Sequence, residues 1–493
     1  MNKKILLVEP FYRTKYPPLG LMKLSTYHKQ KKDEVVFVKG CNKEVLNQYW
    51  DRIYITTLFT WTWDETIKTI KFYHGDNTLF PPSSQCFVGG ILASLMPKEL
   101  YNATGINPIV GLLDDPRKIE QEDNVIIDLL PPDYSILTQV ESEEFKYSNT
   151  EAYLGYTTRG CVRKCGFCAV KTLEPTYKSY IDIKPMVRTV KSKYGEKKDL
   201  LLMDNNVLCS KDFDKIIDDI KSCGFVKEAT FGPTRIKRTV DFNQCLDAEF
   251  LNEHKMKRLS EIPLDPMRIA FDSMEDRDVY EKAVRLAHKY GQVNMSNYIL
   301  YNYQNDTPDD FYERLEINIK LNEEFKVDGS GVKTVIYSFP MRYIPLGAKN
   351  RSEYAGNHNW NNIYLRSVKA ILNVTKGPVM PCAEFFYKAF GRNAEEFKTI
   401  LAMPDRFIIN RLIPDGKKEL DYEKRWMPYV RDWMETYSEL SSKETKALVK
   451  TISENDLESI RKEVVGISSK RIKKLVNYHI NAEEVINKYK NED

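Results

Sequence analysis

Three cysteines lie close together in one stretch of this chain. Cys161, Cys165 and Cys168 are separated by three residues and then by two. Thiolate sulfur is a soft ligand that suits iron–sulfur clusters and zinc. A closed structural site usually takes four protein ligands, and no nearby cysteine or histidine belongs to a second pair of this spacing. Three thiolates leave a metal position open, so the spacing predicts a site that binds an exogenous ligand.

The residues around the cysteines favour one kind of site. A strand-like stretch, residues 153–157, precedes them, and the aromatic Phe167 comes directly before Cys168. In this arrangement the sequence resembles the radical S-adenosylmethionine (radical SAM) superfamily. The resemblance implies a [4Fe-4S] cluster held by the three cysteines, with its fourth iron bound to SAM, and reductive cleavage of SAM to methionine and a 5′-deoxyadenosyl radical. A zinc site completed by a distant ligand, or a chance grouping of structural thiols, would be the alternative.

Composition limits the class of protein. The chain has 493 residues, 42% of them apolar, which predicts two or three domains. Its 74 Lys and Arg residues nearly balance 70 Asp and Glu residues, so charge alone does not demand a nucleic-acid partner. The apolar run at the amino terminus is too short for a signal peptide, and no stretch approaches the roughly 20 apolar residues that span a bilayer. Nine mostly scattered cysteines fit a reducing compartment. We expect a cytoplasmic protein without a membrane partner.

The amino-terminal third alternates short apolar runs with helical patterns. The predicted strands are residues 3–8, 34–38, 52–56, 85–88 and 124–127, and the predicted helices are 19–29 and 62–72. This alternation predicts a doubly wound (Rossmann-like) parallel sheet, with ligands beyond the carboxyl ends of its strands.

Two turns of this sheet carry a second resemblance. Residues 16–21 (Tyr-Pro-Pro-Leu-Gly-Leu) follow the first strand, and Gly89 and Gly90 follow a later one. Residues 1–130 thereby resemble the cobalamin-binding-type domain that precedes many radical SAM enzymes. The chain lacks the Asp-x-His-x-x-Gly motif of a histidine-ligated cobalt. The resemblance leaves cobalamin open as a further cofactor, although a tight strand-to-helix turn explains the glycines equally well.

A linker and a barrel are predicted next. Residues 131–150 begin with a Pro-Pro-Asp turn signal and become acidic, which favours a linker. Residues 151–345 repeat a short apolar strand and a longer helical pattern, so we predict a partial (β/α)6 TIM-like barrel, the fold that the radical SAM resemblance also implies. Its predicted strands are 153–157, 200–203, 239–242, 268–271, 298–301 and 332–337, and its predicted helices are 183–194, 212–223, 247–259, 278–290 and 307–324.

Polar side chains follow four of these strands, at the barrel end that carries chemistry. They are Asp204 and Asn205, Asn243, Asp272 and Ser273, and Asn302. Such a ring suits a ligand with ribose hydroxyls, an ammonium and a carboxylate. From the resemblance we assign Asp204 to the ammonium of SAM, and Asp272 with Ser273 to its ribose. Each residue alone is explained as well by turn formation.

Other residues near the predicted site are weaker candidates. Phe167 is expected to pack near the cluster and the adenine, or simply in the core. Arg159, Arg163 and Lys164 could offset the charge of a cluster, although basic loop residues are usually solvated. Arg342 lies in a loop predicted for 338–347 and could bind the cofactor carboxylate or a substrate phosphate, or form a surface salt bridge. The remaining cysteines after residue 200 match no second cluster motif and are more simply packing thiols; they are Cys209, Cys223, Cys245 and Cys382.

Residues 346–493 show a helical pattern and predict a mostly helical carboxyl-terminal domain. The leading hypothesis is an enzyme that takes one electron from a flavodoxin- or ferredoxin-type donor, cleaves SAM and abstracts hydrogen from a small-molecule or nucleic-acid substrate. A cobalamin-dependent radical SAM methyltransferase is the first alternative. A non-catalytic iron–sulfur or zinc protein that senses or binds a partner is the second.

Overall fold

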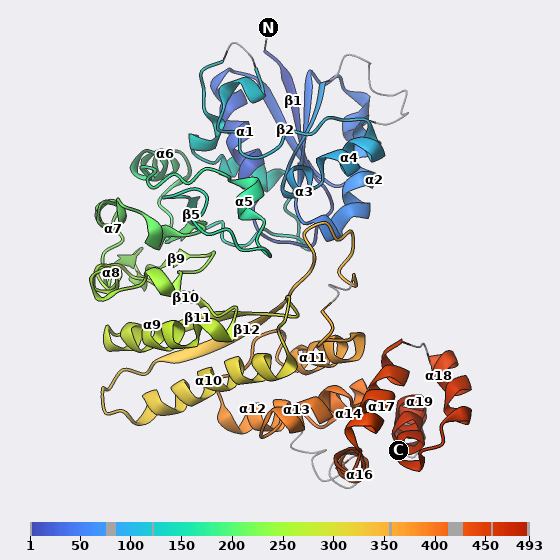
Figure 1. Cartoon of the computed structure of the whole chain (residues 1–493). Coiled ribbons are helices and arrows are strands. Elements are labelled where there is room, and N and C mark those ends of the chain that lie inside the picture. Colours follow the sequence, from blue (N-terminus) through green and yellow to red (C-terminus); the bar gives the residue numbers. More distant parts are fainter. Residues whose placement is uncertain are drawn as a thin grey trace. The chain divides into compact units, whose positions relative to one another are not determined.

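The computed structural model describes residues 2–74, 85–120, 123–353, 357–412, 427–454 and 457–490. The chain divides into two compact units (Figure 1). The first unit is Met1–Arg268 with Ile344–Glu353, and the second is Ile269–Tyr343 with Tyr354–Asp493.

The first unit begins with a four-stranded parallel sheet in the order β2-β1-β3-β4. Its strands are β1 (Lys4–Glu9), β2 (Glu34–Lys39), β3 (Arg52–Thr57) and β4 (Gln85–Gly90), and its helices are α1 (Leu19–Gln30), α2 (Trp63–His74), α3 (Ile91–Leu95) and α4 (Pro97–Thr104). The central strand β1 is buried on both faces, which is why residues 5–8 are all apolar. Helix α1 covers one face, and α2 with α4 covers the other (Figure 1). The predicted doubly wound sheet is confirmed.

The predicted strand at 124–127 is wrong. This segment has no ladder partner and ends in a single 3-10 turn, Ile127–Leu129. Of this segment only Ile127 is buried, and directly after it the buried carboxylate of Asp128 lies against Lys23 of α1 and Arg159.

A second parallel sheet of the first unit has three strands in the order β5-β6-β9. They are β5 (Ala152–Gly155), β6 (Asp199–Leu202) and β9 (Val240–Phe242), with helices α5 (Val170–Leu173), α6 (Lys184–Tyr194), α7 (Phe213–Ser222) and α8 (Glu253–Leu259), and a small hairpin of β7 (Thr230–Phe231) and β8 (Ile236–Lys237). The helix predicted for 247–259 is wrong over its first half. Asp247 caps a short 3-10 turn, and Asn252 then caps α8 by accepting the N–H of Lys255 at 2.9 Å.

The second unit holds the other three strands predicted for a barrel, in the order β10-β11-β12. They are β10 (Met267–Ala270), β11 (Asn294–Tyr301) and β12 (Val335–Arg342), with helices α9 (Arg277–Lys289) and α10 (Pro308–Val327). The loop predicted for 338–347 begins later than expected, because β12 continues in parallel with β11 as far as Arg342. Pro340 is tolerated there since β12 is an edge strand of this sheet. The arrangement of all six strands as one partial barrel stays a prediction.

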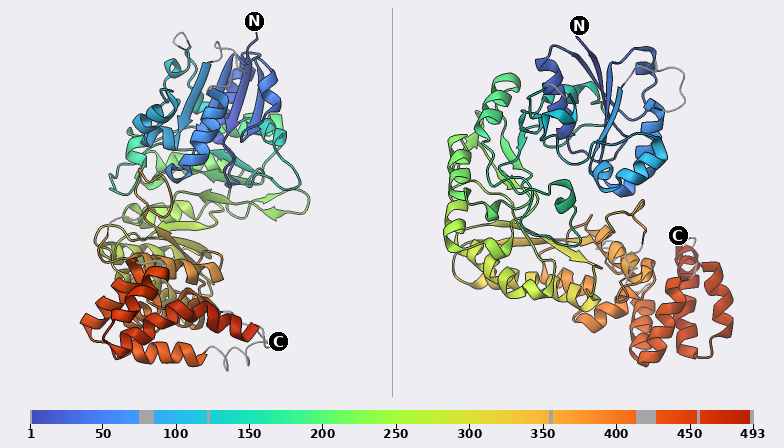
Figure 2. Two further views of the ribbon diagram at one scale, coloured as in Figure 1. Left: turned by 90° about the vertical axis from the view of Figure 1, so that its right-hand side faces the viewer. Right: turned by 45° about the horizontal axis from the view of Figure 1, so that its top comes forward.

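The carboxyl-terminal part of the second unit is helical, as predicted. Its helices are α11 (Asn362–Val374), α12 (Ala383–Phe390), α13 (Ala394–Leu401), α14 (Asp405–Asn410), α16 (Met427–Ser438), α17 (Ser442–Glu454), α18 (Leu457–Glu463) and α19 (Lys470–Lys490). Buried aromatic side chains such as Trp360, Phe386 and Trp433 form its core. Helices α16, α17 and α18 pack against α19 (Figure 2).

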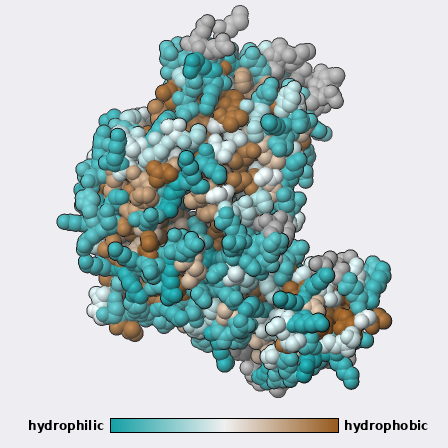
Figure 3. Space-filling view, in the orientation of Figure 1, coloured by the Kyte–Doolittle hydropathy of each residue, from teal (hydrophilic) through white to brown (hydrophobic). Residues whose placement is uncertain are grey.

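The face in Figure 3 is mostly hydrophilic, and its apolar side chains form small separate groups. In the part of the chain that the structure describes, no helix is both long and apolar enough to cross a membrane.

Candidate cluster and cofactor site

The cysteine loop follows β5 and leads into α5. Its three cysteines are half-buried and form no disulfide. The sulfur of Cys161 accepts the backbone N–H of Arg163 at 3.3 Å and the side-chain amide of Asn206 at 3.6 Å. Hydrogen bonds to ligand sulfur are part of the surroundings of protein-bound iron–sulfur clusters, so the donors around Cys161 fit a metal ligand. Within the described ranges, no three His, Cys, Asp or Glu side chains are arranged so that they could hold one metal ion.

Gly160 closes the base of this loop. Its φ is +74°, and a Cβ atom there would lie 2.8 Å from the carbonyl oxygen of Thr176, so only glycine fits. The N–H of Gly160 donates to Glu174 at 2.6 Å. Arg159 and Lys178 also exchange two backbone hydrogen bonds, of 3.1 and 2.9 Å. The two ends of the segment that carries the cysteines are therefore fastened together.

The turn after β6 holds the start of the cysteine loop. Each of its polar residues contacts a different point of that segment. Asp204 accepts from Thr157 and Thr158, the amide of Asn205 donates to Glu174 at 2.9 Å, and the amide of Asn206 reaches Cys161. The predicted cofactor residues Asp204 and Asn205 thus lie beside the cysteine loop, and their assignment to SAM stays a prediction.

Asp204 is buried, and no cation among the described residues lies beside it. One of its oxygens accepts the N–H of Thr157 at 2.9 Å and the hydroxyls of Thr157 and Thr158 at 2.6 and 2.7 Å. Burial raises the pKa of this carboxyl group, although the four hydrogen-bond donors from Thr157 and Thr158 oppose the shift. A cation brought to this point, such as an ammonium, would favour the ionised form.

Four buried charged side chains meet at Arg159, two residues before Cys161. Its guanidinium donates to Glu174 at 2.8 Å and to Asp128 at 3.1 Å, and it lies over the ring of Tyr156 at 3.5 Å. Lys23 of α1 also contacts Asp128, with 3.3 Å between Nζ and Oδ1. We call Lys23, Asp128, Arg159 and Glu174 the charge cluster.

The electrostatics of the charge cluster follow from burial and pairing. Burial lowers the pKa of Lys23 to about 8. Burial by itself would raise the pKa of Asp128, but Lys23 and Arg159 hold it at about 2. All four side chains are at most 11% exposed, so the two cations and two anions balance each other within a poorly solvated site.

A second network lies on the other side of the loop. The guanidinium of Arg163 forks onto Asp247 and also contacts Glu249. Asp247 accepts the amide of Asn206 at 2.9 Å, and that amide is the one that reaches Cys161. The position of Arg163 in a loop suggested a solvated side chain, but in the structure it is paired with carboxylates.

Two further predicted residues lie in the first unit. Asn243 follows β9, and its amide donates to the hydroxyl of Tyr16 at 3.0 Å. Phe167 is half-buried within the cysteine loop. Neither observation tests a role in SAM binding, so the assignments of Asn243 and Phe167 stay predictions.

The remaining predicted residues lie in the second unit. Ser273 accepts the N–H of Glu275 at 3.2 Å and so caps a turn, while Asp272 follows β10 and Arg342 ends β12. Asn302 differs from these. It is fully buried, its φ is +66°, and neither its side-chain oxygen nor its side-chain nitrogen has a hydrogen-bond partner among the residues that the structure describes. A buried amide of this kind is costly unless a ligand or water satisfies it, which suits its predicted role.

Four residues of the site were missed by sequence analysis as candidates: Asp128, Glu174, Asn206 and Asp247. Asn206 stands in the polar run after β6 and could have been included on that signal. The others have no local signal, because the partners that place them in the site lie between 14 and 105 positions away.

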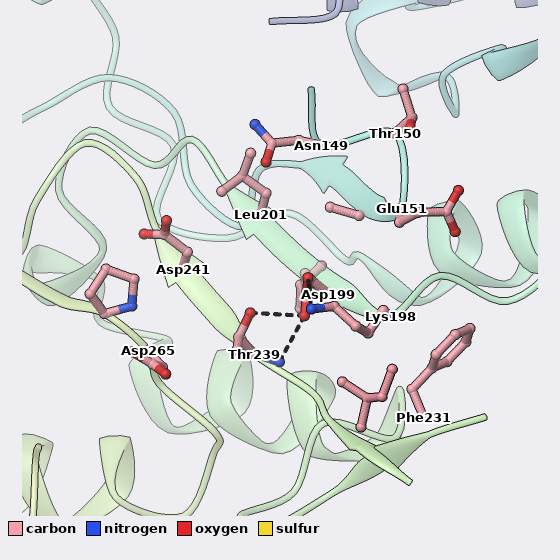
Figure 4. Close-up of a pocket in the computed structure, with 14 residues that line it drawn as sticks. Asn149, Thr150, Glu151, Lys198, Asp199, Leu201, Phe231, Thr239, Asp241 and Asp265 are labelled. Atoms are coloured by element: carbon pink, nitrogen blue, oxygen red, sulfur yellow. Dashed lines mark hydrogen bonds and ion pairs between the residues drawn. The ribbon is translucent and has the colours of Figure 1, made fainter. Parts of the chain in front are cut away.

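A cavity of about 640 Å³ lies at the ends of β5, β6 and β9 opposite to the cysteine loop (Figure 4). Its lining comes from the amino-terminal ends of these strands and includes Glu151, Asp199, Asp241 and Phe231. The carboxylate of Asp199 accepts hydrogen bonds from the N–H and the hydroxyl of Thr239, at 3.1 and 2.9 Å. The cysteines follow the carboxyl end of β5, so this cavity is separate from the candidate site.

Comparison with known proteins gives a family match and several similar solved structures. The model of the radical SAM superfamily matches residues 156–316. No curated protein matches the chain. Two structures of the radical S-adenosylmethionine methyltransferase TsrM from Kitasatospora setae are similar, each at 15% identity with a TM-score of 0.48 and covering 70% of this chain. One has cobalamin and a [4Fe-4S] cluster bound and is covered over 77% of its length, and the other has tryptophan substrate and the SAM analogue aza-SAM bound and is covered over 75%.

The family match includes all three cysteines and the turn after β6. It implies SAM and a [4Fe-4S] cluster as cofactors. The chain therefore contains a radical SAM domain over residues 156–316, and this domain supports an enzyme of the radical SAM class.

Proposed function

We propose that this enzyme binds a [4Fe-4S] cluster through Cys161, Cys165 and Cys168 and uses it to activate SAM. A cluster held by these cysteines would supply the electron for reductive cleavage of SAM to methionine and a 5′-deoxyadenosyl radical, and that radical would remove a hydrogen atom from a substrate. The observation that carries this proposal is a loop of three thiols fastened at its base, with N–H donors on Cys161, inside the matched domain.

The chain's own residues would position the reactants. Asp204 is the candidate partner for the ammonium of SAM because it is a buried carboxylate without a cation, next to the loop. Asn302 offers an amide whose hydrogen-bonding groups have no protein partner. An enzyme of this class needs an external one-electron donor, for which a flavodoxin or ferredoxin is the expected type.

The test is the reaction of anaerobically reconstituted protein with SAM and dithionite. We expect about four iron atoms per chain and formation of 5′-deoxyadenosine, and we expect Cys165→Ala to lose both. Cys223→Ala is the matched control, because it removes a half-buried thiol at the end of α7, outside the loop. A full cluster without 5′-deoxyadenosine would favour the non-catalytic alternative, and bound zinc in place of iron would contradict the proposal.

A cobalamin-dependent methyltransferase is the second candidate. Aromatic side chains lie past the carboxyl ends of β1 and β3, where Phe11 is 68% exposed and Phe59 stacks on Trp61. Exposed rings of this kind suit the flat face of a macrocycle. Gly90 gives no support for a cobalamin site, because packing within the protein already requires glycine there. A Cβ atom at this position would lie 2.2 Å from the carbonyl oxygen of Thr57. Cobalamin absorbance after reconstitution, together with a methylated product, would distinguish this candidate.

A further inference from the structure

The charge cluster joins two parts of the first unit that are far apart in sequence. Lys23 belongs to α1 and Asp128 to the segment after the four-stranded sheet, whereas Arg159 and Glu174 lie on the two sides of the cysteines. A single guanidinium contacts a carboxylate from each part. The amino-terminal sheet region is thereby tied to the base of the cysteine loop.

The shape of arginine matters at this point. The fork of Arg159 presents separate N–H groups to Asp128 and Glu174 while its plane lies on Tyr156. A lysine ammonium is a point charge without this planar fork, so it cannot reproduce both contacts and the stacking. Glu174 depends on Arg159 in turn, and it also holds the N–H of Gly160 and the amide of Asn205.

We propose that Arg159 is a positioning residue, through which Asp128 and the amino-terminal sheet region hold the cysteine loop in the shape that receives the cluster. The effect on the cluster rests on the proposed function, whereas the effect on the loop does not. Because the four charges are buried and balanced, removal of one leaves an unpaired buried charge and loosens its partners.

The first test is hydrogen–deuterium exchange of the cofactor-free chain, read at the amides of Gly160 and Lys178. For Arg159→Lys we expect exchange on the order of a hundredfold faster at both amides. Asp128→Asn, which changes no residue of the cysteine loop itself, should speed exchange at the same amides to a smaller extent. The control is Arg117→Lys, because Arg117 forks onto Asp115 in the same way but on the surface. Unchanged exchange in both test variants would overturn the proposal.

The second test is the iron content and reduction potential of the reconstituted protein. We expect Asp128→Asn to lower the iron content or to shift the cluster potential, although Asp128 touches no cysteine. If wild-type protein makes no 5′-deoxyadenosine but Arg159→Lys still loosens the loop, the proposed function fails and the positioning role stands. Where Arg159→Lys does not fold, Glu174→Gln takes its place, since it keeps an acceptor for Gly160 but loses the charge that pairs with Arg159. Normal exchange and normal iron content in Glu174→Gln and Asp128→Asn would refute the role.

Discussion

Asp204→Ala tests whether the turn after β6 holds the cysteine loop. In the wild-type protein, one carboxylate accepts the backbone N–H groups of Thr157 and Thr158 and both of their hydroxyls. Alanine leaves two buried N–H groups without an acceptor, and each such group costs about 1–3 kcal/mol. The threonine hydroxyls can rotate to other acceptors. We therefore expect local destabilisation of about 2–6 kcal/mol.

Two further variants calibrate this value. Asp204→Asn keeps one acceptor oxygen in place, so we expect a loss of only about 1 kcal/mol. Asp199→Ala removes a carboxylate from the start of the same strand, where it accepts one N–H and one hydroxyl of Thr239. Because Asp199 is partly exposed, water can replace it, and we expect less than about 1 kcal/mol.

The assay is native-state hydrogen exchange at the amides of Thr157 and Thr158, since a chain of two units need not unfold in one step. Wild-type exchange in Asp204→Ala would refute the structural role. SAM binding by reconstituted protein tests the predicted ammonium contact separately. If Asp204 also binds the ammonium, Asp204→Asn should fold almost normally but weaken SAM binding roughly 10–100-fold, which corresponds to a charged hydrogen bond of about 1.5–3 kcal/mol.

Two other predictions concern stability. Gly90→Ala should destabilise the first unit by more than about 3 kcal/mol in urea unfolding, because its Cβ atom would overlap the carbonyl of Thr57 at a φ of +113°; Gly20→Ala in α1 meets nothing within 4 Å and should be neutral or slightly stabilising. Burial lowers the pKa of His479 from 6.5 to about 4 while its ring donates to a backbone carbonyl at 2.9 Å. The neutral ring therefore contributes stability that is present above pH 6.5 and is lost as the pH falls through 4, by about 3 kcal/mol. His479→Gln can keep the donor and should remove this pH dependence from thermal unfolding of the second unit; an unchanged profile would contradict the assignment.

Local pattern was sufficient for most of the strands and helices. An apolar run such as residues 5–8, flanked by turn residues, can only be a buried strand once a parallel sheet is inferred. The same logic placed Asp204 and Asn302 at strand ends, because the end of an apolar run is visible in the sequence. What each side chain touches was not visible, since the contacts of Asp204 are 46 and 47 residues away.

The errors share a physical cause. At 124–127 an apolar run was taken for a strand, but its neighbour Asp128 is buried by ion pairs with distant residues. At 247–259 the helical pattern ignored Asn252, whose side chain begins a new helix. At 338–347 a loop was predicted, but β12 continues through Pro340 to Arg342, which is possible because β12 lies at the edge of its sheet. The pattern of apolar residues predicts that a helix or strand is present. Where the element begins and ends depends on its place in a sheet and on hydrogen bonds and ion pairs that the pattern does not show.

Charge around the cysteine loop illustrates the same limit. Basic residues beside the cysteines suggested that positive charge would offset an anionic cluster. Arg159 is balanced by Asp128 and Glu174, however, and Arg163 is balanced by Asp247. These arginines therefore bring little net charge to the thiols. The N–H groups aimed at sulfur, such as the two that reach Cys161, act at short range even where the ionic charges cancel, so we expect them to influence a bound cluster more than these arginines do.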